Sequence, residues 1–123
     1  MNTKRKGSLA IGEAINYFTN KGITVLLPIA DCDLYDLAID DGGLKRIQCK
    51  YTDYQQSNGG YNVDLRTFGG YREKTYHLRY KDGDFDFLFI HCGNGQKYLI
   101  PAEKVIDRTH IVVGSRSWNE YKC

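Results

Sequence analysis

Two short segments, residues 34–40 and 46–50, flank the turn sequence Asp41-Gly42-Gly43, and this arrangement constrains the fold more than any other part of the chain. Both segments alternate between apolar and polar residues, as half-buried β-strands do. Asp and Gly are favoured in tight hairpin turns. A loop of these three residues would pair Asp40 with Leu44. The sequence therefore predicts an antiparallel hairpin.

Counting back from the loop places Asp36 opposite Gln48, and directly opposed residues of an antiparallel pair project from the same face of the sheet. Lys50, two residues beyond Gln48, shares that face because side chains alternate along a strand. A slip of one residue would separate these polar groups and bury one of them. The apolar side chains fall on the opposite face: Leu37, Ile39, Ile47 and Cys49.

The polar face of this hairpin can hold a divalent metal against a phosphodiester. The carboxylate of Asp36 suits a hard cation such as Mg²⁺, and Gln48 offers a neutral carbonyl oxygen. Lys50 can stabilise the charge that develops on a phosphate or orient the attacking water. For each residue a simpler role stays open: a turn-capping Asp, a solvated Gln and a surface Lys paired with an acid. A metal-dependent nuclease is the first hypothesis.

The bulk composition is compatible with this hypothesis without singling it out. The 123 residues are 41% hydrophobic and 26% charged, and the formal net charge of +2 is mildly basic. Such a chain suits a single globular domain, residues 1–123, that can bind nucleic acid. No run is apolar enough to span a membrane, no apolar region follows the basic N-terminus, and no His or Cys has zinc-ligand spacing. We expect a cytoplasmic protein with reduced thiols.

Further regular elements are expected on both sides of the hairpin. Ser8 is a favourable N-cap, and Gly22 a favourable end, for a helix that carries an apolar stripe. The short strand that follows, residues 23–27, is ended by Pro28. Four more elements are expected: an apolar strand at 85–91 that is covered on both faces, a strand at 97–100, a short helix at 101–106 and a strand at 111–113.

From residue 51 to about residue 82 the chain changes character. Tyrosines are interleaved with Arg and Lys, and little apolar periodicity is sustained. We expect an excursion from the core, either partly helical or a hairpin, that contacts DNA. Arg and Lys would neutralise phosphates and Tyr would hydrogen-bond to them. The candidate DNA-binding residues are Arg66, Arg72, Lys74, Arg79, Tyr61 and Tyr71.

Two alternatives stay open for these basic and aromatic groups. The excursion can instead be an irregular loop whose tyrosines cover the edge of the sheet. The N-terminal residues Lys4, Arg5 and Lys6 can add phosphate contacts or form a disordered tail.

The order of these motifs resembles the PD-(D/E)xK nuclease superfamily. The resemblance spans residues 6 to 106 and is carried by Lys6-Gly7, Gly12-Glu13, the strand ending at Pro28, Tyr35-Asp36-Leu37, Ile47-Gln48-Cys49-Lys50, Asp86-Phe87-Leu88 and Tyr98-Leu99-Ile100-Pro101. The most similar branch contains homing endonucleases encoded in group I introns, and archaeal Holliday-junction resolvases are similar more loosely. The superfamily usually has Asp or Glu where this chain has Gln48, but Gln is known in the homing branch. Many relatives have Thr or Ser at Tyr51.

The resemblance implies an α/β fold with a restriction-endonuclease-like core, a mixed β-sheet flanked by helices. It implies a DNA endonuclease that uses Mg²⁺, for which Mn²⁺ can substitute. Asp36, Gln48 and the backbone carbonyl of Cys49 would bind the metal. Asp36, Gln48, Lys50 and Glu13 would be catalytic. Glu13 is implied by the resemblance alone, because on a helical wheel it falls opposite the apolar stripe, where a solvated side chain is equally expected.

Double-stranded or branched DNA is the expected substrate, with no membrane partner. Cutting both strands needs two sites, so we expect a homodimer or a homotetramer. A homing-type enzyme is the leading hypothesis, and a junction-resolving or restriction-like nuclease is the alternative. From another class, a catalytically silent DNA-binding module stays open because Gln48 is not an acid.

Overall fold

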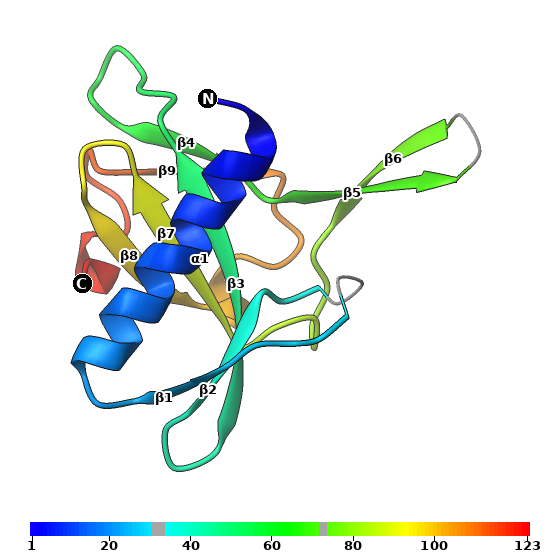
Figure 1. Cartoon of the computed structure of the whole chain (residues 1–123). Coiled ribbons are helices and arrows are strands. Elements are labelled where there is room, and N and C mark those ends of the chain that lie inside the picture. Colours follow the sequence, from blue (N-terminus) through cyan, green and yellow to red (C-terminus); the bar gives the residue numbers. More distant parts are fainter. Residues whose placement is uncertain (31–33, 72–73) are drawn as a thin grey trace.

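A five-stranded mixed sheet forms the centre of the computed structural model, which describes residues 1–30, 34–71 and 74–123. Over 67–71 and 74–77 it describes the backbone only. The strand order is β1-β2-β3-β7-β8 (Figure 1). The strands are β1 (Thr24–Leu26), β2 (Leu37–Asp40), β3 (Leu44–Thr52), β7 (Phe87–Cys92) and β8 (Lys97–Pro101). Strands β3 and β7 are parallel and the other neighbours are antiparallel. The sheet is therefore mixed, as predicted.

The β2–β3 hairpin has the predicted register. Leu37 pairs with Ile47, and Asp40 pairs with Leu44 across the predicted loop. Gly42 in this loop has a φ of +71°, a conformation that glycine adopts without strain. Asp36 precedes the first residue of β2, and its backbone N–H donates to the Ile47 carbonyl at 2.9 Å. The hairpin thus fixes the position of Asp36 beside β3.

Helix α1 (Thr3–Asn20) begins earlier than predicted. Asn2, not Ser8, is the N-cap, and its side chain accepts a hydrogen bond from the Arg5 N–H at 2.9 Å. Ser8 lies inside the helix, where its hydroxyl donates to the Lys4 carbonyl at 3.1 Å. The alternative of a disordered basic tail is therefore wrong, because these residues form the first turns of α1. The helix ends at Asn20 with Lys21 as its C-cap, and Gly22, the residue predicted to end it, follows directly with a φ of +75°.

Helix α1 covers one face of the sheet (Figure 1). Its buried residues pack on the apolar face of the hairpin and on β7, in a cluster that includes Ala10, Ala14, Phe18, Leu37, Ile39, Ile47, Cys49 and Phe89. On β7 Phe89 belongs to this cluster, whereas Leu88 and Ile90 belong to the cluster on the other face. The prediction that β7 is covered on both faces is confirmed. None of the described helices is long and apolar enough to cross a membrane.

The second face of the sheet is covered by a small sheet of β4 (Tyr61–Asp64) and β9 (His110–Val113). Two short 3₁₀ helices, η1 (Ala102–Lys104) and η2 (Asn119–Tyr121), complete this side, and η1 occupies the predicted helix at 101–106. The prediction that residues 51–82 leave the core is wrong for β4, because Tyr61 and Val63 are buried in the second cluster, and it is wrong also for Leu65 and Tyr80, which are buried there too. The fold is the expected mixed α/β fold, with one α-helix on one face and this small sheet on the other.

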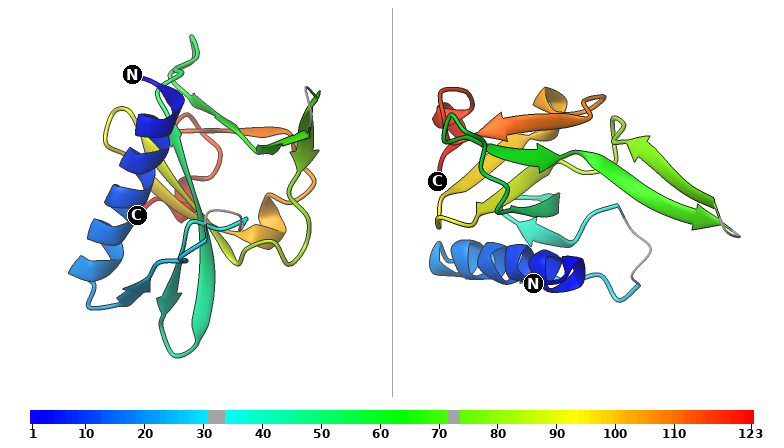
Figure 2. Two further views of the ribbon diagram at one scale, coloured as in Figure 1. Left: turned by 45° about the vertical axis from the view of Figure 1, so that its right-hand side comes forward. Right: turned by 90° about the horizontal axis from the view of Figure 1, so that it is seen from above.

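The hairpin β5 (Arg66–Tyr71) and β6 (Lys74–Arg79), here called the arm, projects from the body of the protein (Figures 1 and 2). It pairs only with itself in the described topology. The excursion from residue 51 to about residue 82 was expected to be either partly helical or a hairpin, and in the arm it is a hairpin. Seen from above, the arm and the N-terminal end of α1 lie towards the same side of the molecule (Figure 2).

Candidate active site

Asp36 is tied to β3 by a second backbone contact. Its carboxylate Oδ2 accepts a hydrogen bond from the N–H of Cys49 at 2.8 Å. The N–H and C=O of one strand residue point to the same side, so the Cys49 carbonyl also points towards Asp36, beyond the start of β2. The Gln48 side-chain amide donates to this carbonyl at 3.4 Å. Three oxygen-bearing groups expected at a metal thus lie together at one end of the hairpin.

Lys50 is partly buried on the same face of β3 as Gln48. Its ammonium nitrogen lies 5.3 Å from the centroid of the Tyr80 ring, within the range of a cation–π contact. Burial lowers the pKa of Lys50, and the nearby charges of Asp64 and Asp36 oppose that shift. The ammonium group therefore contacts an aromatic ring and feels the charges of two carboxylates.

These side chains open into one groove of about 490 Å³. Strand β3 and the residue before β2 contribute Asp36, Gln48, Cys49 and Lys50, while α1 contributes Lys6 and β4 contributes Asp64. The structure therefore brings Asp36, Gln48 and Lys50 together, as the hairpin register requires.

The contribution of Asp64 was missed from the sequence. Its Oδ1 accepts hydrogen bonds from the Arg66 backbone N–H at 2.9 Å and Nε at 3.1 Å, and its Oδ2 accepts from the terminal guanidinium nitrogen at 3.0 Å. Partial burial raises the pKa of Asp64, but the hydrogen bonds and charge of Arg66, with a smaller effect of Lys50, lower it overall. The alternation of Tyr61 and Val63 with polar residues was the available signal for β4, and it was read as part of the excursion.

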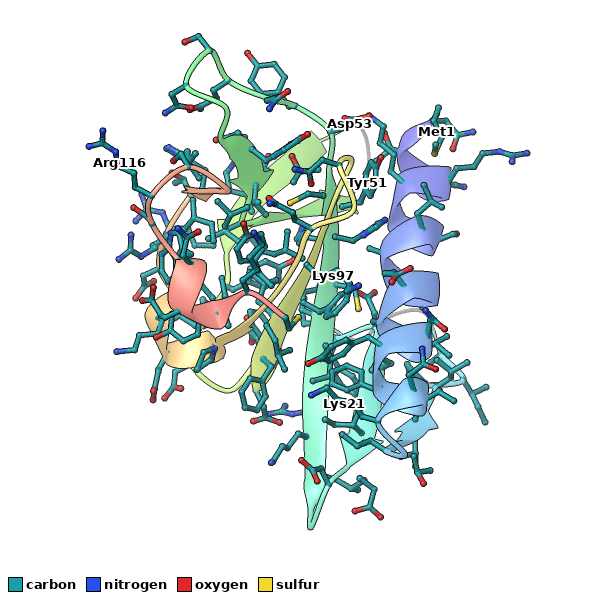
Figure 3. All side chains as sticks on the ribbon, turned by 90° about the vertical axis from the view of Figure 1, so that its left-hand side faces the viewer. Met1, Lys21, Tyr51, Asp53, Lys97 and Arg116 are labelled. Carbon is teal, nitrogen blue, oxygen red and sulfur yellow. The ribbon has the colours of Figure 1, made fainter. Side chains whose placement is uncertain are left out.

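Glu13 is not among the residues that line the groove. Its Oε1 lies 3.5 Å from the ammonium nitrogen of Lys97 on β8. Figure 3 shows the Lys97 side chain on the side of the sheet that faces α1. The neighbouring His91 has a lowered pKa, mainly because of burial, and its Nδ1 is buried with no hydrogen-bond partner among the described residues. The structure thus places Glu13 in an ion pair with Lys97 rather than beside Asp36.

The rim of the groove is basic at the start of α1. Lys6 pairs with Asp53 at 3.1 Å, and Figure 3 shows Asp53 and Tyr51 near the N-terminal end of the helix. The first turn of α1 contains no acid and carries the run Lys4, Arg5 and Lys6. Cations are unfavourable at the positive end of a helix dipole, so this run is not explained by helix stability.

The expected DNA-binding residues lie at different depths. Arg66 and Arg79 are opposite each other at the base of the arm, and the exposed Arg79 guanidinium donates to the Asp107 carbonyl at 3.4 Å. Tyr71 and Lys74 pair at its tip, and Arg72 lies outside the described residues. The expectation for Tyr61 is wrong: the residue is only 7% exposed because its ring packs in the core.

The oxygen atoms of Asp36, Gln48 and Cys49 are hard donors, which suit Mg²⁺ or Mn²⁺. The described residues contain no group of three or more His, Cys, Asp and Glu side chains that could hold a metal. A site with one carboxylate, one amide and one backbone carbonyl fits a cation that also takes ligands from a substrate phosphate and from water. The donor set is therefore compatible with the implied metal.

Comparisons with known proteins find relatives that match most of the chain. The family model described as PD-(D/E)XK endonuclease matches residues 1–120. Protein 5.3 of Escherichia phage T7 is 31% identical over 101 residues, which are 81% of this chain and 80% of that protein. The solved structure of a bacterial homing endonuclease, I-Ssp6803I, superposes with a TM-score of 0.85 at 27% identity, covering 99% of this chain and 89% of that one.

Proposed function

The chain belongs to the PD-(D/E)XK endonuclease family, and from this premise we propose that it is a Mg²⁺-dependent enzyme that hydrolyses DNA phosphodiester bonds. One observation carries the proposal: Asp36, Gln48 and Lys50 line a single groove beside the N-terminal end of α1. Nucleases of this family generally use divalent metals and act on DNA.

Asp36, Gln48 and the Cys49 carbonyl would hold the cation. When bound, Mg²⁺ would polarise the phosphodiester and lower the pKa of water. Mn²⁺ accepts the same oxygen donors and would substitute for it. The hydrogen bond from the Cys49 N–H orients Asp36, so the carboxylate needs little rearrangement to act.

Lys50 acts on the substrate phosphate. Its partly buried position on β3 and its contact with Tyr80 restrict the ammonium group to the groove. From there it donates hydrogen bonds to a non-bridging phosphate oxygen and offsets the negative charge that develops during attack.

Basic groups on both sides of the groove would bind the DNA backbone. The N-terminal end of α1 provides a positive helix dipole together with Lys4, Arg5 and Lys6. On the other side, Arg66 and Arg79 are directly opposed at the base of the arm. Arg66 is also paired with Asp64, whereas the Arg79 side chain is exposed and can approach a phosphate. Contact with DNA is also proposed for Tyr71 and Lys74 of the arm and for Arg72, which lies outside the described residues.

The likeness to a homing endonuclease favours an enzyme that reads a specific duplex target. Cutting both strands requires two grooves, so the active form would be a symmetric homodimer or homotetramer. A junction-resolving or restriction-like nuclease on the same core is the alternative within this class.

A catalytically silent DNA-binding module is a second candidate, and Gln48 is the observation that favours it. An amide binds a cation less strongly than the carboxylate usual at this position. A silent module would still need the basic surfaces but not Lys50 in its buried position.

Incubation of supercoiled plasmid and synthetic four-way junctions with Mg²⁺ or Mn²⁺ separates these functions. The nuclease proposal predicts nicking or cutting that Asp36→Ala abolishes. Preferential cutting of the junction would favour the resolving alternative. Binding without cutting on any DNA, or equal cutting by Asp36→Ala, would contradict the proposal.

A further inference from the structure

The charge in the groove does not come from the hairpin alone. Among the described residues that line it, the acids are Asp36 and Asp64 and the cations are Lys6 and Lys50. Lys6 is already paired with Asp53. Because Gln48 is neutral, Asp36 and Asp64 carry the negative charges among these residues, and Asp64 is the one that comes from outside the hairpin.

Asp64 lies between the groove and a neighbouring cavity, and it lines both of them. Both of its carboxylate oxygens accept hydrogen bonds from Arg66. Arg66 does not line the groove; it lines the neighbouring cavity with Asn62, Thr109 and His110. The positive charge of the pair is therefore displaced from the groove, and the negative charge is at its wall.

The charge of Asp64 also acts on Lys50, which lines the same groove. It opposes the lowering of the Lys50 pKa more strongly than the charge of Asp36 does. Asp64 therefore acts on a group of the hairpin, although its own strand β4 lies in a different sheet.

We propose that Asp64 is a positioning residue of the active site, whose charge acts across the groove in place of the carboxylate that Gln48 does not supply. It acts through space, because its oxygens are occupied by Arg66. The inference rests on the proposed function, since it assumes that a divalent cation binds at Asp36.

Mn²⁺ binding to the whole protein without DNA, measured by isothermal titration calorimetry, tests this role. Asp64→Asn should weaken binding by about tenfold, because one negative charge near a divalent cation is removed. Arg66→Gln is the matched variant: it breaks the same ion pair but keeps the acid, so binding should become about twofold tighter. Asp82→Asn, an exposed acid away from the groove, should bind Mn²⁺ as the wild type does.

Relocation of the charge separates an electrostatic role from a structural one. Adding Gln48→Glu to Asp64→Asn should restore Mn²⁺ affinity to within about twofold of the wild type. Loss of a fold-stabilising Asp64–Arg66 pair would not be rescued by an acid on β3. Thermal unfolding of each variant checks that it is folded. If Asp64→Asn does not fold, the Mn²⁺ affinity of Arg66→Gln decides between the two roles.

The outcomes distinguish this inference from the proposed function. Wild-type affinity in Asp64→Asn, with binding lost in Asp36→Asn, would overturn the role of Asp64 and leave the metal site intact. Weaker binding by Arg66→Gln would also overturn it, because the pair and not the charge would then matter. If the wild type does not bind Mn²⁺, or if Asp36→Asn binds it equally well, the proposed metal site and this inference are both overturned.

Discussion

The carboxylate of Asp36 accepts a hydrogen bond from the backbone N–H of Cys49 at 2.8 Å, so the acid before β2 is held by the strand that carries Gln48 and Lys50. This contact orients the acid and leaves its charge directed at the groove. Position and charge can therefore be tested separately.

Asp36→Asn should keep the contact and lose the charge, because an Asn side-chain oxygen can still accept from the Cys49 N–H. DNA cleavage should fall at least about 100-fold, as expected for loss of a metal ligand. The free energy of unfolding should fall by no more than about 1 kcal/mol. Plasmid cleavage and urea denaturation measure the two effects, and a folded variant that cuts normally would contradict the role of Asp36.

Gln48→Glu should restore a second acid to the hairpin. Cleavage should then reach half its maximum at about tenfold lower Mg²⁺, because a carboxylate binds the cation more strongly than an amide. Without metal the variant should be less stable than the wild type, since Glu no longer donates to the Cys49 carbonyl. A Mg²⁺ titration of cleavage checks this, with Gln56→Glu as an added acid outside the groove lining. An unchanged Mg²⁺ requirement would argue against Gln48 as a ligand.

Arg79→Gln should weaken DNA binding without changing the metal requirement. Each lost phosphate contact reduces the slope of log affinity against log salt concentration by about one. Lys104→Gln is the matched control, an exposed cation in η1 and not part of the arm. Fluorescence anisotropy at several salt concentrations measures both variants, and an unchanged slope for Arg79→Gln would place the arm outside the DNA interface.

Glu13→Gln distinguishes the position of Glu13 in this structure from the role that the resemblance implies. Because Glu13 pairs with Lys97, we expect cleavage within about threefold of the wild type and a loss of stability below about 1 kcal/mol. Lys97→Met should have a similar small effect. A loss of cleavage in Glu13→Gln comparable to that of Asp36→Asn would show that Glu13 moves to the groove when DNA or metal binds.

The stability of the protein should depend on Asp86 in acid. Asp86 accepts hydrogen bonds from the Arg46 N–H at 2.7 Å and from the guanidinium Nε at 3.4 Å, and the backbone bond is the main reason that its pKa is lowered. The unfolded chain therefore takes up a proton near pH 3.8 before the native protein does, and the contribution of Asp86 is lost as the pH falls below that value. Denaturation at pH 7 and pH 3 should show a smaller acid loss for Asp86→Asn than for the wild type. An equal loss in both proteins would exclude this contribution.

The hairpin and its register were predictable because the signals are local. The turn at 41–43 lies between two alternating segments, and only one register buries Leu37 and Ile47 together. The same register count places Asp36, Gln48 and Lys50 together on the other face. This part of the proposed site could therefore be predicted from the sequence.

The parts that were not predictable depend on distant contacts. Strand β4 pairs with β9, whose residues lie more than 40 positions later in the chain, so nothing near Tyr61 or Asp64 announces the partner. Without that pairing the buried tyrosines of residues 51–82 looked like surface groups, and Asp64 had no reason to face Lys50. The helix start was missed because Asn2 precedes a basic run that disfavours a helix N-terminus.

Anomalous diffraction from crystals of the protein with Mn²⁺ and a DNA duplex would locate the proposed metal site. We expect a Mn²⁺ peak in the groove, bound by Asp36 and the Cys49 carbonyl beside Gln48, and the Lys50 ammonium group against a phosphate of the DNA at that peak. A complex in which DNA lies elsewhere, or in which the groove holds DNA but no Mn²⁺ peak, would contradict it.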